Sequence, residues 1–400
     1  MGTGNLMIVQ GGGSTAVFNA SLSSAIAEAV CQKKIGRVYG ARFGVKGLIR
    51  DEIVELGQMT TAQLHLLRNS PGALLGSSRF KPDMNELDRM VTNLRRLDVR
   101  YMIFIGGNGT MRGAELASRH FGQAGFGVQI VGVPKTVDND IAATDRCPGY
   151  ASAARYVAQS TRDLGMDIRS LPQPVTILEV IGRSIGWLAA ASTLAKDSDV
   201  DAPHLVHLPE MPFHPEEFLT RLEAIVTKQG WAVAVVSEGI RNPVGSLVYE
   251  LNDPIHLDPL NRPMTGGVGQ FLADMVGASL KIRCRSEKPG LLARVSMAHI
   301  SPRDQEDAEL VGREGVRALM SGETDKMVAL RPLKDPGPTG CELVPLSAIA
   351  GVERTVTQEW LTNGPLAVGP EFQNYLRPLV GELYRYSPAP PPAIPRIGAF

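Results

Sequence analysis

The sequence is organised as short apolar runs that end in glycine or polar turns, each followed by a helix-like segment. Near the N-terminus, residues 6–10 form such a run, GGGST follows it, and a helical pattern spans residues 20–31. The other strand candidates are residues 101–105, 128–133, 176–180, 205–208 and 231–236. Continuous apolar strands that alternate with helices predict an α/β fold with parallel sheets covered on both faces.

Chain length and charge narrow the class of protein further. A chain of 400 residues exceeds the size at which one hydrophobic core stops growing, so we expect two closely packed domains. The 41 basic residues balance 41 acidic ones, which leaves no overall field to attract nucleic acid or an anionic membrane surface. We therefore expect no nucleic-acid or membrane partner, and any anion-binding site must be local.

Three other sequence features bear on the protein's environment. The four cysteines, Cys31, Cys147, Cys284 and Cys341, lack the paired spacing of zinc sites or disulfide scaffolds, so we expect them to be reduced and mostly buried. The N-terminus has no basic flank before its short apolar run, and no stretch approaches membrane-spanning length, which predicts a cytoplasmic protein. The proline-rich segment 387–400 predicts an extended or disordered tail.

Glycine-rich turns follow three of the predicted strands, at residues 11–13, 106–109 and 132–140. Ligands of parallel sheets bind beyond the carboxyl ends of the strands, so we expect these loops to converge on one crevice. In the turn GGNGT, small residues allow backbone N–H groups to approach phosphate oxygens before the next helix begins. On its own, however, a glycine-rich turn is also common as a simple connection at the end of a strand.

The turn after residues 128–133 carries charged and hydroxyl side chains that could act in this crevice. It carries a cation at Lys135, a hydroxyl at Thr136 and carboxylates at Asp138 and Asp140. Phosphoryl transfer needs these parts: charge neutralisation, metal positioning, and a carboxylate that takes the acceptor's proton. Two plainer interpretations remain open at this point, a helix N-cap for Asp138 and a solvated surface position for Lys135.

The motif PKTVDND resembles the PKTIDND signature of the phosphofructokinase family, especially its pyrophosphate-dependent branch, and GGNGT resembles the family's GGDGS or GGDDT loop. Further blocks resemble the family in the same order, at residues 147–158, 179–195, 208–213, 236–240 and 266–276, and from residue 283 onward to DAELVG. The resemblance covers roughly residues 5–330. Agreement of that many separated blocks does not arise by chance.

The resemblance implies the phosphofructokinase fold, with two Rossmann-like three-layer α/β/α domains. Residues 1–149, with a returning segment near residues 295–325, are expected to bind the phosphoryl donor. Residues 150–294, joined by residues 326–400, are expected to bind the sugar phosphate, with the active site between the two domains. In the family a neighbouring subunit completes part of the sugar-phosphate site, which implies a homodimer or homotetramer.

The implied reaction is Mg²⁺-dependent transfer of a phosphoryl group from pyrophosphate to the 1-hydroxyl of fructose 6-phosphate, giving fructose 1,6-bisphosphate in glycolysis. By resemblance, the catalytic residues are the base Asp138, together with Thr136, Arg183 and Lys135. The positions that match substrate contacts are Asp140, Ile181, Gly182, Glu238, Arg283 and Arg294. Those that match donor contacts are Gly12, Gly13, Arg79, Phe80, Gly107, Gly109 and Thr110, and Asn108 matches a metal ligand. A surface ion pair is the plainer alternative for Arg183, Glu238, Arg283 and Arg294.

The sequence departs from the family pattern at three places in these loops. Asn108 replaces a metal-binding aspartate and supplies no negative charge, and Val17 stands where the family has a glycine. Gly109 replaces the second aspartate of pyrophosphate-dependent members, which leaves room for ATP. Lys135 and the motif EVIGRSIGW are similar to the sequences of the pyrophosphate branch, whereas Gly109 and the turn at residues 76–80 are compatible with ATP. We favour pyrophosphate.

Four alternatives to this function remain open. The enzyme could use ATP as its donor, or a related acceptor such as sedoheptulose 7-phosphate. In a different class, the chain could be a regulatory homologue that binds sugar phosphate without turnover. In that case Asn108 and Val17 would be the substitutions that impair catalysis. A nicotinamide-dependent dehydrogenase ranks lowest, because no G-x-G-x-x-G motif opens the first helix.

Overall fold

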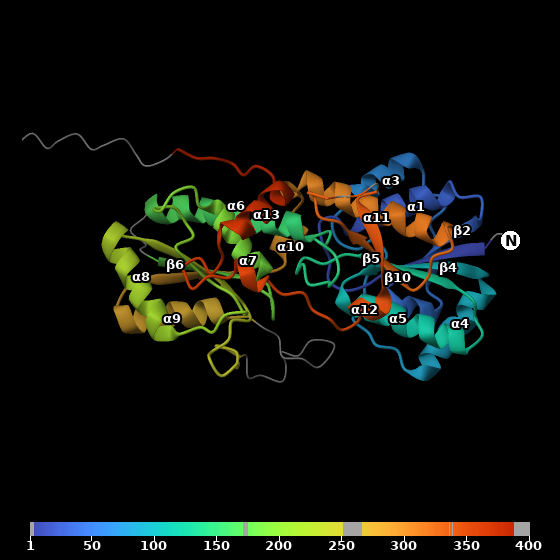
Figure 1. Ribbon diagram of the computed structural model, residues 1–400, viewed down its shortest axis with the longest axis horizontal. Coiled ribbons are helices and arrows are strands. Elements are labelled where there is room, and N and C mark those ends of the chain that lie inside the picture. Colours follow the sequence, from blue (N-terminus) through green and yellow to red (C-terminus); the bar gives the residue numbers. More distant parts are fainter. Residues whose placement is uncertain (1–3, 171–174, 251–265, 336, 338, 388–400) are drawn as a thin grey trace, which may run out of the picture.

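The computed structural model describes residues 4–170, 175–250, 266–335, 337 and 339–387. They form two lobes that lie side by side along the long axis, each built around its own sheet (Figure 1). One sheet has seven strands in the order β11-β10-β5-β4-β1-β2-β3, and the other has four in the order β7-β8-β6-β9. The predicted α/β class with mainly parallel sheets is confirmed.

The first lobe contains the seven-stranded sheet. Its strands are β1 (Gly4–Gln10), β2 (Ile35–Ala41), β3 (Ile53–Glu55), β4 (Val99–Gly106), β5 (Gln129–Pro134), β10 (Lys326–Leu330) and β11 (Cys341–Pro345). The two edge strands, β3 and β11, run antiparallel to their neighbours, whereas the five inner strands are parallel. Because β1, β4 and β5 are adjacent and parallel, the loops that follow them emerge at one edge of the sheet.

Helices cover both faces of this sheet. One apolar cluster holds side chains of α1 (Phe18–Val30), α3 (Thr61–Arg68) and α11 (Pro302–Met320) against one face. A second cluster holds α2 (Val45–Arg50), α4 (Met84–Arg96), α5 (Asn108–Gln123) and α12 (Leu346–Ile349) against the other face. Side-chain caps fix where several of these helices begin: Thr60 and Asp83 form capping boxes at α3 and α4, and Ser301 caps α11.

The second lobe repeats this three-layer arrangement around the four-stranded sheet. Its strands, all parallel, are β6 (Val175–Val180), β7 (Leu205–His207), β8 (Ala232–Ser237) and β9 (Cys284–Glu287). One face packs against α6 (Tyr150–Ser170), α7 (Trp187–Ala191) and α13 (Pro370–Val380). The opposite face packs against α8 (Pro215–Gln229) and α9 (Val268–Leu280). Short helical segments, α10 (Leu292–Val295), η1 (Ser192–Ala195), η2 (Met297–His299) and η3 (Gln358–Trp360), complete the described elements.

The division of the chain between the lobes differs from the expected one in the C-terminal part. Helix α11 lies in the first lobe, where the returning segment was expected near residues 295–325. The expectation that residues 326–400 join the second lobe is wrong for β10 and β11, because β10 pairs with β5, placing Lys326 opposite Val131. Helix α13 does pack in the second lobe, on α6.

The cysteine expectation is correct in part. All four cysteines are free thiols, but only Cys147 is buried; Cys31 is exposed, and Cys284 and Cys341 are partly exposed. Within the described ranges, no helix is both long and apolar enough to cross a membrane. Of the predicted C-terminal tail, residues 388–400 lie outside the described residues.

Candidate active site

The three glycine-rich loops of the first lobe meet at the carboxyl ends of β1, β4 and β5. The Gly11 amide donates to the Ile105 carbonyl at 2.9 Å, and the Lys135 amide donates to the Gly106 carbonyl at 2.9 Å. A Cβ atom at Gly11 would stand 2.5 Å from Thr110 Oγ1, and one at Gly106 only 2.2 Å from the same oxygen. Glycine is therefore required at both positions because the Thr110 side chain fills the space between the loops.

Lys135 is fully buried at the centre of these loops. Its Nζ donates to the Gly13 carbonyl at 2.5 Å and lies 4.2 Å from the centroid of the Phe18 ring. Burial lowers the pKa of Lys135 to about 7, although the nearby carboxylates of Asp138 and Asp140 oppose this shift. A bound anion near Lys135 Nζ would favour the protonated, charged form of this side chain. The burial of Lys135 excludes the solvated surface position considered for it.

Asp138 faces Lys135 in the loop that follows β5. Burial, together with the charges of Asp140 and Glu238, raises the pKa of Asp138 to about 7, against the opposing effects of Lys135 and Arg79. The Asp138 amide donates to Thr136 Oγ1 at 3.1 Å. The N-cap interpretation of Asp138 is wrong, because the next helix, α6, begins only at Tyr150. A carboxyl with a pKa near neutrality is suited to accept a proton during catalysis.

Asn108, the first residue of α5, lies against Asp140. Its side-chain amide donates to the Asp140 carbonyl at 2.8 Å and to Asp140 Oδ2 at 2.9 Å. The remaining side-chain oxygens, Asn108 Oδ1 and Asp140 Oδ1, are buried without a hydrogen-bond partner. No group of three His, Cys, Asp or Glu side chains in the described part of the chain is arranged to hold a metal ion. Two unpartnered oxygens nevertheless fit Mg²⁺, which takes few protein ligands when phosphate oxygens supply the others.

Cations surround the first glycine loop as well. A Cβ atom at Gly13 would lie 3.4 Å from Arg294 Nη1 and 3.8 Å from Arg79 Nη2, and both charges act on Lys135. Ser77 Oγ donates to the Gly12 carbonyl at 2.6 Å, which ties the turn at residues 76–80 to this loop. Arg294, expected at the sugar phosphate, therefore lies at the donor loop beside Arg79.

Gly12, in the first glycine loop, lies against Lys135 and Gly107. A Cβ atom at Gly12, where φ is +80°, would lie 3.4 Å from Lys135 Nζ and 3.7 Å from the Gly107 amide nitrogen. Phe80 is half-buried, with Lys46 Nζ 5.2 Å from its ring centroid. Val17 is fully buried in an apolar cluster with Ala308 of α11, so packing accounts for its side chain.

The second lobe contributes the residues that follow β6 and β8. The Gly182 amide donates to Glu238 Oε1 at 3.5 Å, and the charge of Glu238 acts on Asp138 in the first lobe. At Gly182 φ is +146°, and a Cβ there would lie 2.5 Å from the Ile185 carbonyl oxygen. The two lobes therefore face each other across Asp138 and Glu238.

Sequence reasoning missed Gly239 in this loop. A Cβ atom at Gly239 would lie 1.5 Å from the Arg183 carbonyl oxygen, so only glycine allows the two loops to approach. Ile181 packs at the border of the core of the second lobe and does not reach the cation cluster through its side chain. The signal that could have found Gly239 is the pair of turns after strands β6 and β8, which are neighbours in the sheet.

Arg283 is not brought to this site within one chain. It is exposed and immediately precedes β9, whose first residue, Cys284, pairs with Val175 at the amino end of β6. The loop of Gly182 begins beyond the other end of β6, after Val180, roughly 17 Å away at the rise of an extended strand. A role for Arg283 at this site requires a second chain.

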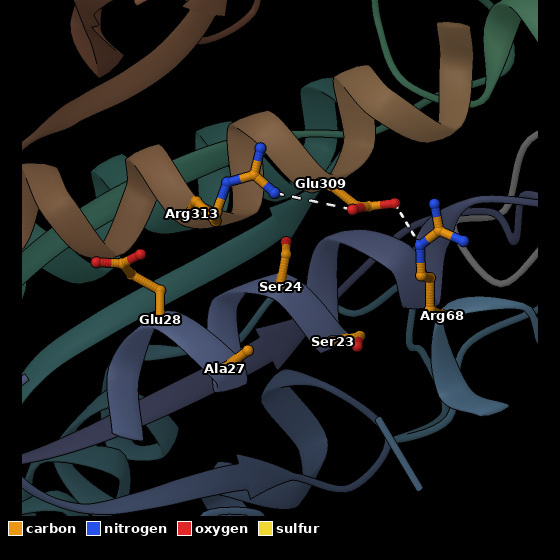
Figure 2. Close-up of a pocket in the computed structure, with 7 residues that line it drawn as sticks. All are labelled: Ser23, Ser24, Ala27, Glu28, Arg68, Glu309 and Arg313. Carbon is orange, nitrogen blue, oxygen red and sulfur yellow. Dashed lines mark hydrogen bonds and ion pairs between the residues drawn. The ribbon is translucent and has the colours of Figure 1, made fainter. Parts of the chain in front are cut away.

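A separate hollow of about 280 Å³ lies between α1 and α11, with Arg68 of α3 at its rim. Figure 2 shows Arg313 and Arg68 reaching Glu309 from two sides, so that the central carboxylate is already paired with cations. The other lining residues are Ser23, Ser24, Ala27 and Glu28. None of the predicted site residues lines this hollow, which is therefore not the candidate active site.

Comparisons with known proteins show the family of this chain. Residues 5–319 match the family described as phosphofructokinase. The chain is 33% identical over 389 residues to pyrophosphate–fructose 6-phosphate 1-phosphotransferase of Rhodospirillum rubrum, covering 94% of each chain. It is 31% identical to a sulfofructose kinase of Alkalicoccus urumqiensis, over 88% of this chain and 93% of that protein. The crystal structure of a pyrophosphate-dependent phosphofructokinase from Nitrosospira multiformis superposes with a TM-score of 0.86 at 30% identity, covering 98% of this chain and 95% of the other. This chain belongs to the phosphofructokinase family.

Proposed function

We propose that this protein transfers a phosphoryl group from pyrophosphate to the 1-hydroxyl of fructose 6-phosphate, giving fructose 1,6-bisphosphate and phosphate. The observation that carries the proposal is the pair of buried Lys135 and half-buried Asp138 at the meeting point of three loops. A cation and a carboxylate at one buried point serve the two needs of phosphoryl transfer, charge neutralisation and proton removal.

In this proposal the donor lies at the first glycine loop and the N-terminus of α5. Lys135, Arg79 and Arg294 surround that loop, and they would neutralise the donor's phosphates. The free amides at the start of α5 add backbone donors, since the first N–H groups of a helix have no partner within it. Pyrophosphate has no adenosine, so its binding depends on such local charges.

The acceptor sugar phosphate is placed on the side of the second lobe. Glu238 and the loop of Ile181, Gly182 and Arg183 would hold it so that its 1-hydroxyl reaches Asp138. Asp138 takes the hydroxyl proton as the sugar oxygen attacks the terminal phosphorus, and the bridging P–O bond of the donor breaks to release phosphate. Thr136 steadies the base through its bond to the Asp138 amide.

Asn108 and Asp140 are the residues that would hold Mg²⁺, through the two buried oxygens that lack partners. When bound, the ion would neutralise charge on the phosphoryl group being transferred. Burial raises the pKa of Asp140, and hydrogen bonding with Asn108 and Thr136 opposes this shift.

ATP is the second candidate donor, and Gly109 is the observation that favours it. Nothing lies within 4 Å of the Cβ position at Gly109, so the space beside the donor loop is open. Open space permits a nucleotide but supplies no attraction for an adenine ring, which is why pyrophosphate remains the first choice. The similarity to a sulfofructose kinase makes the acceptor a separate question, to be tested with more than one sugar.

We further propose that the protein is a homodimer or homotetramer. The support is the position of Arg283, which is exposed and far from the rest of the site within one chain. A second chain could bring this arginine to the sugar phosphate. Light scattering on the purified protein should give a multiple of the 43.0 kDa chain mass, and a monomer that retains full activity would refute this proposal.

A coupled assay tests the donor and the acceptor together. Purified protein with Mg²⁺ is given fructose 6-phosphate, sedoheptulose 7-phosphate or sulfofructose, each with pyrophosphate or with ATP. We expect the largest kcat/KM for pyrophosphate with fructose 6-phosphate. A larger kcat/KM with ATP would transfer the assignment to the second candidate donor, and no turnover with any pair would favour a regulatory homologue.

A further inference from the structure

The C-terminal segment beyond the family match returns to the loop that carries Asp138. The family match ends at residue 319, yet Glu353 forms an isolated antiparallel bridge with Ile141. Next to it, the Arg354 amide donates to the Asp140 carbonyl at 2.8 Å. This segment therefore supplies backbone partners to a loop that has no regular secondary structure of its own.

Tyr375 of α13 contacts the same loop through its hydroxyl. It donates to the Asp145 carbonyl at 2.8 Å and accepts from Asn139 Nδ2 at 3.3 Å. Asn139 directly follows Asp138 and has a left-handed backbone, with φ of +53°, while its Oδ1 accepts from the Cys147 amide at 2.9 Å. The Tyr375 hydroxyl thus joins both halves of the loop, on either side of the turn.

Arg354 connects this loop to the one that carries Arg183. Its Nη1 donates to the Asp145 carbonyl at 2.6 Å, and its guanidinium lies 4.6 Å from the Trp187 ring. Trp187 opens α7 immediately after the Arg183 loop, and its Nε1 donates to the Arg354 carbonyl at 3.4 Å. One residue from outside the matched region therefore contacts both the Asp138 loop and the first residue of the helix that follows the Arg183 loop.

We propose that Tyr375 and Arg354 are positioning residues that hold the Asp138 loop against the Arg183 loop. Neither touches substrate; both contact the Asp145 carbonyl of the loop, and Tyr375 also contacts the Asn139 side-chain amide. The proposal rests on the proposed phosphoryl transfer for its kinetic consequence, but the mechanical part stands on the contacts alone. Displacement of a catalytic group by about 1 Å can cost on the order of 10²-fold in rate, so such contacts have a measurable effect.

The test compares Tyr375→Phe with Tyr386→Phe in the full-length protein. Tyr386 lies in the same C-terminal segment and also has two hydroxyl partners, Asp163 and Gln159, but both are on α6 and away from the loop. Each substitution removes one phenolic oxygen and leaves the ring. For Tyr375→Phe we expect kcat to fall about 10- to 100-fold with KM for both substrates within about twofold, because position and not affinity is lost. Tyr386→Phe should leave kcat and KM unchanged.

Amide hydrogen exchange provides a readout that does not depend on activity. Peptides covering residues 136–149 should exchange faster in Tyr375→Phe and in Arg354→Met, but not in Tyr386→Phe. The kcat losses of Tyr375→Phe and Arg354→Met should be less than multiplicative in the double variant, because both act on one loop.

Three results would overturn the proposal. Unchanged exchange in residues 136–149 would mean that these contacts do not hold the loop. Faster exchange with kcat unaltered would mean that holding the loop does not serve catalysis. Faster exchange throughout the chain would assign the two residues to general stability. If the wild-type protein transfers no phosphoryl group from either donor, the proposed function fails, and the exchange data still decide whether Tyr375 and Arg354 hold the loop.

Discussion

The side-chain amide of Asn108 donates two hydrogen bonds to Asp140, one to its carbonyl at 2.8 Å and one to Oδ2 at 2.9 Å. An aspartate at residue 108 could donate neither bond and would set a second carboxylate against the first. Asparagine therefore holds Asp140 in place without a metal ion, while its Oδ1 stays unpartnered. The replacement of the family's aspartate reduces local negative charge but keeps the oxygen ligands.

Asn108→Asp should make the stability of the protein depend more strongly on Mg²⁺. Without the ion, repulsion between residues 108 and 140 lowers the Tm. With the ion, two carboxylates bind it more tightly than one, so saturating Mg²⁺ should raise the Tm by more than in the wild type. Thermal unfolding with and without Mg²⁺ measures this difference.

Asn93→Asp is the control, because Asn93 also donates its amide to a carbonyl, that of Leu48, but away from the site. It should lower the Tm and leave the response to Mg²⁺ unchanged. An equal Mg²⁺ response in Asn108→Asp and the wild type would contradict the assignment of the metal to Asn108 and Asp140.

Gly109→Asp should suppress ATP use without abolishing transfer from pyrophosphate. The Cβ position at Gly109 has open space around it, so an aspartate fits there without backbone strain and places its charge where a nucleotide's inner phosphate would lie. Gly113→Asp is a matched control, since Gly113 lies one turn further along α5 with the same open surroundings. The ratio of kcat/KM values for the two donors should change in Gly109→Asp alone; an unchanged ratio would show that residue 109 does not discriminate between them.

Asp138→Asn should stabilise the protein at pH 8 but not at pH 4. The pKa of Asp138 rises from 3.8 to about 7 in the folded protein because of burial and neighbouring carboxylates. Between pH 3.8 and about 7, Asp138 binds a proton in the folded state but not in the unfolded state. The contribution of Asp138 to the free energy of unfolding therefore falls as the pH rises toward 7. Asparagine removes that dependence, and the Tm difference from wild type should grow between pH 4 and pH 8.

The exposed Asp274 of α9 offers a control substitution away from the site, Asp274→Asn. A Tm for Asp138→Asn that follows the wild type at every pH would show that Asp138 is not held as a buried, proton-binding carboxyl.

Six strands could be predicted because they are continuous apolar runs that end in turns; five of them are inner strands of covered parallel sheets, and β7 is an edge strand that is largely buried. Most of the missed strands lack that signal. Strand β9 reads CRSE, and as the last strand of its sheet it needs no apolar run. Strand β2 contains two glycines, and β3 is only three residues long. Strand β10 is apolar, but its return to the first sheet is a long-range pairing that no local pattern specifies.

The convergence of Lys135, Asp138 and Gly12 could be predicted, since each lies just beyond a strand of one parallel sheet. The positions of Arg294 and Arg283 could not. Both lie in the same stretch of chain, yet one reaches the donor loop and the other precedes an edge strand. The contact of Tyr375 with the Asp138 loop could not be predicted either, because its partner Asp145 is 230 residues away in the chain.

The central claim is that Asp138 removes the proton of the attacking sugar hydroxyl, and Asp138→Ser tests it most directly. Phosphorus NMR follows pyrophosphate and fructose 6-phosphate with Mg²⁺ and either wild-type or Asp138→Ser protein, while calorimetry measures fructose 6-phosphate binding to each. We predict conversion to fructose 1,6-bisphosphate and phosphate by the wild type, and a rate lower by about 10²- to 10⁴-fold for Asp138→Ser with sugar-phosphate affinity nearly unchanged. A wild-type rate in Asp138→Ser would contradict the account.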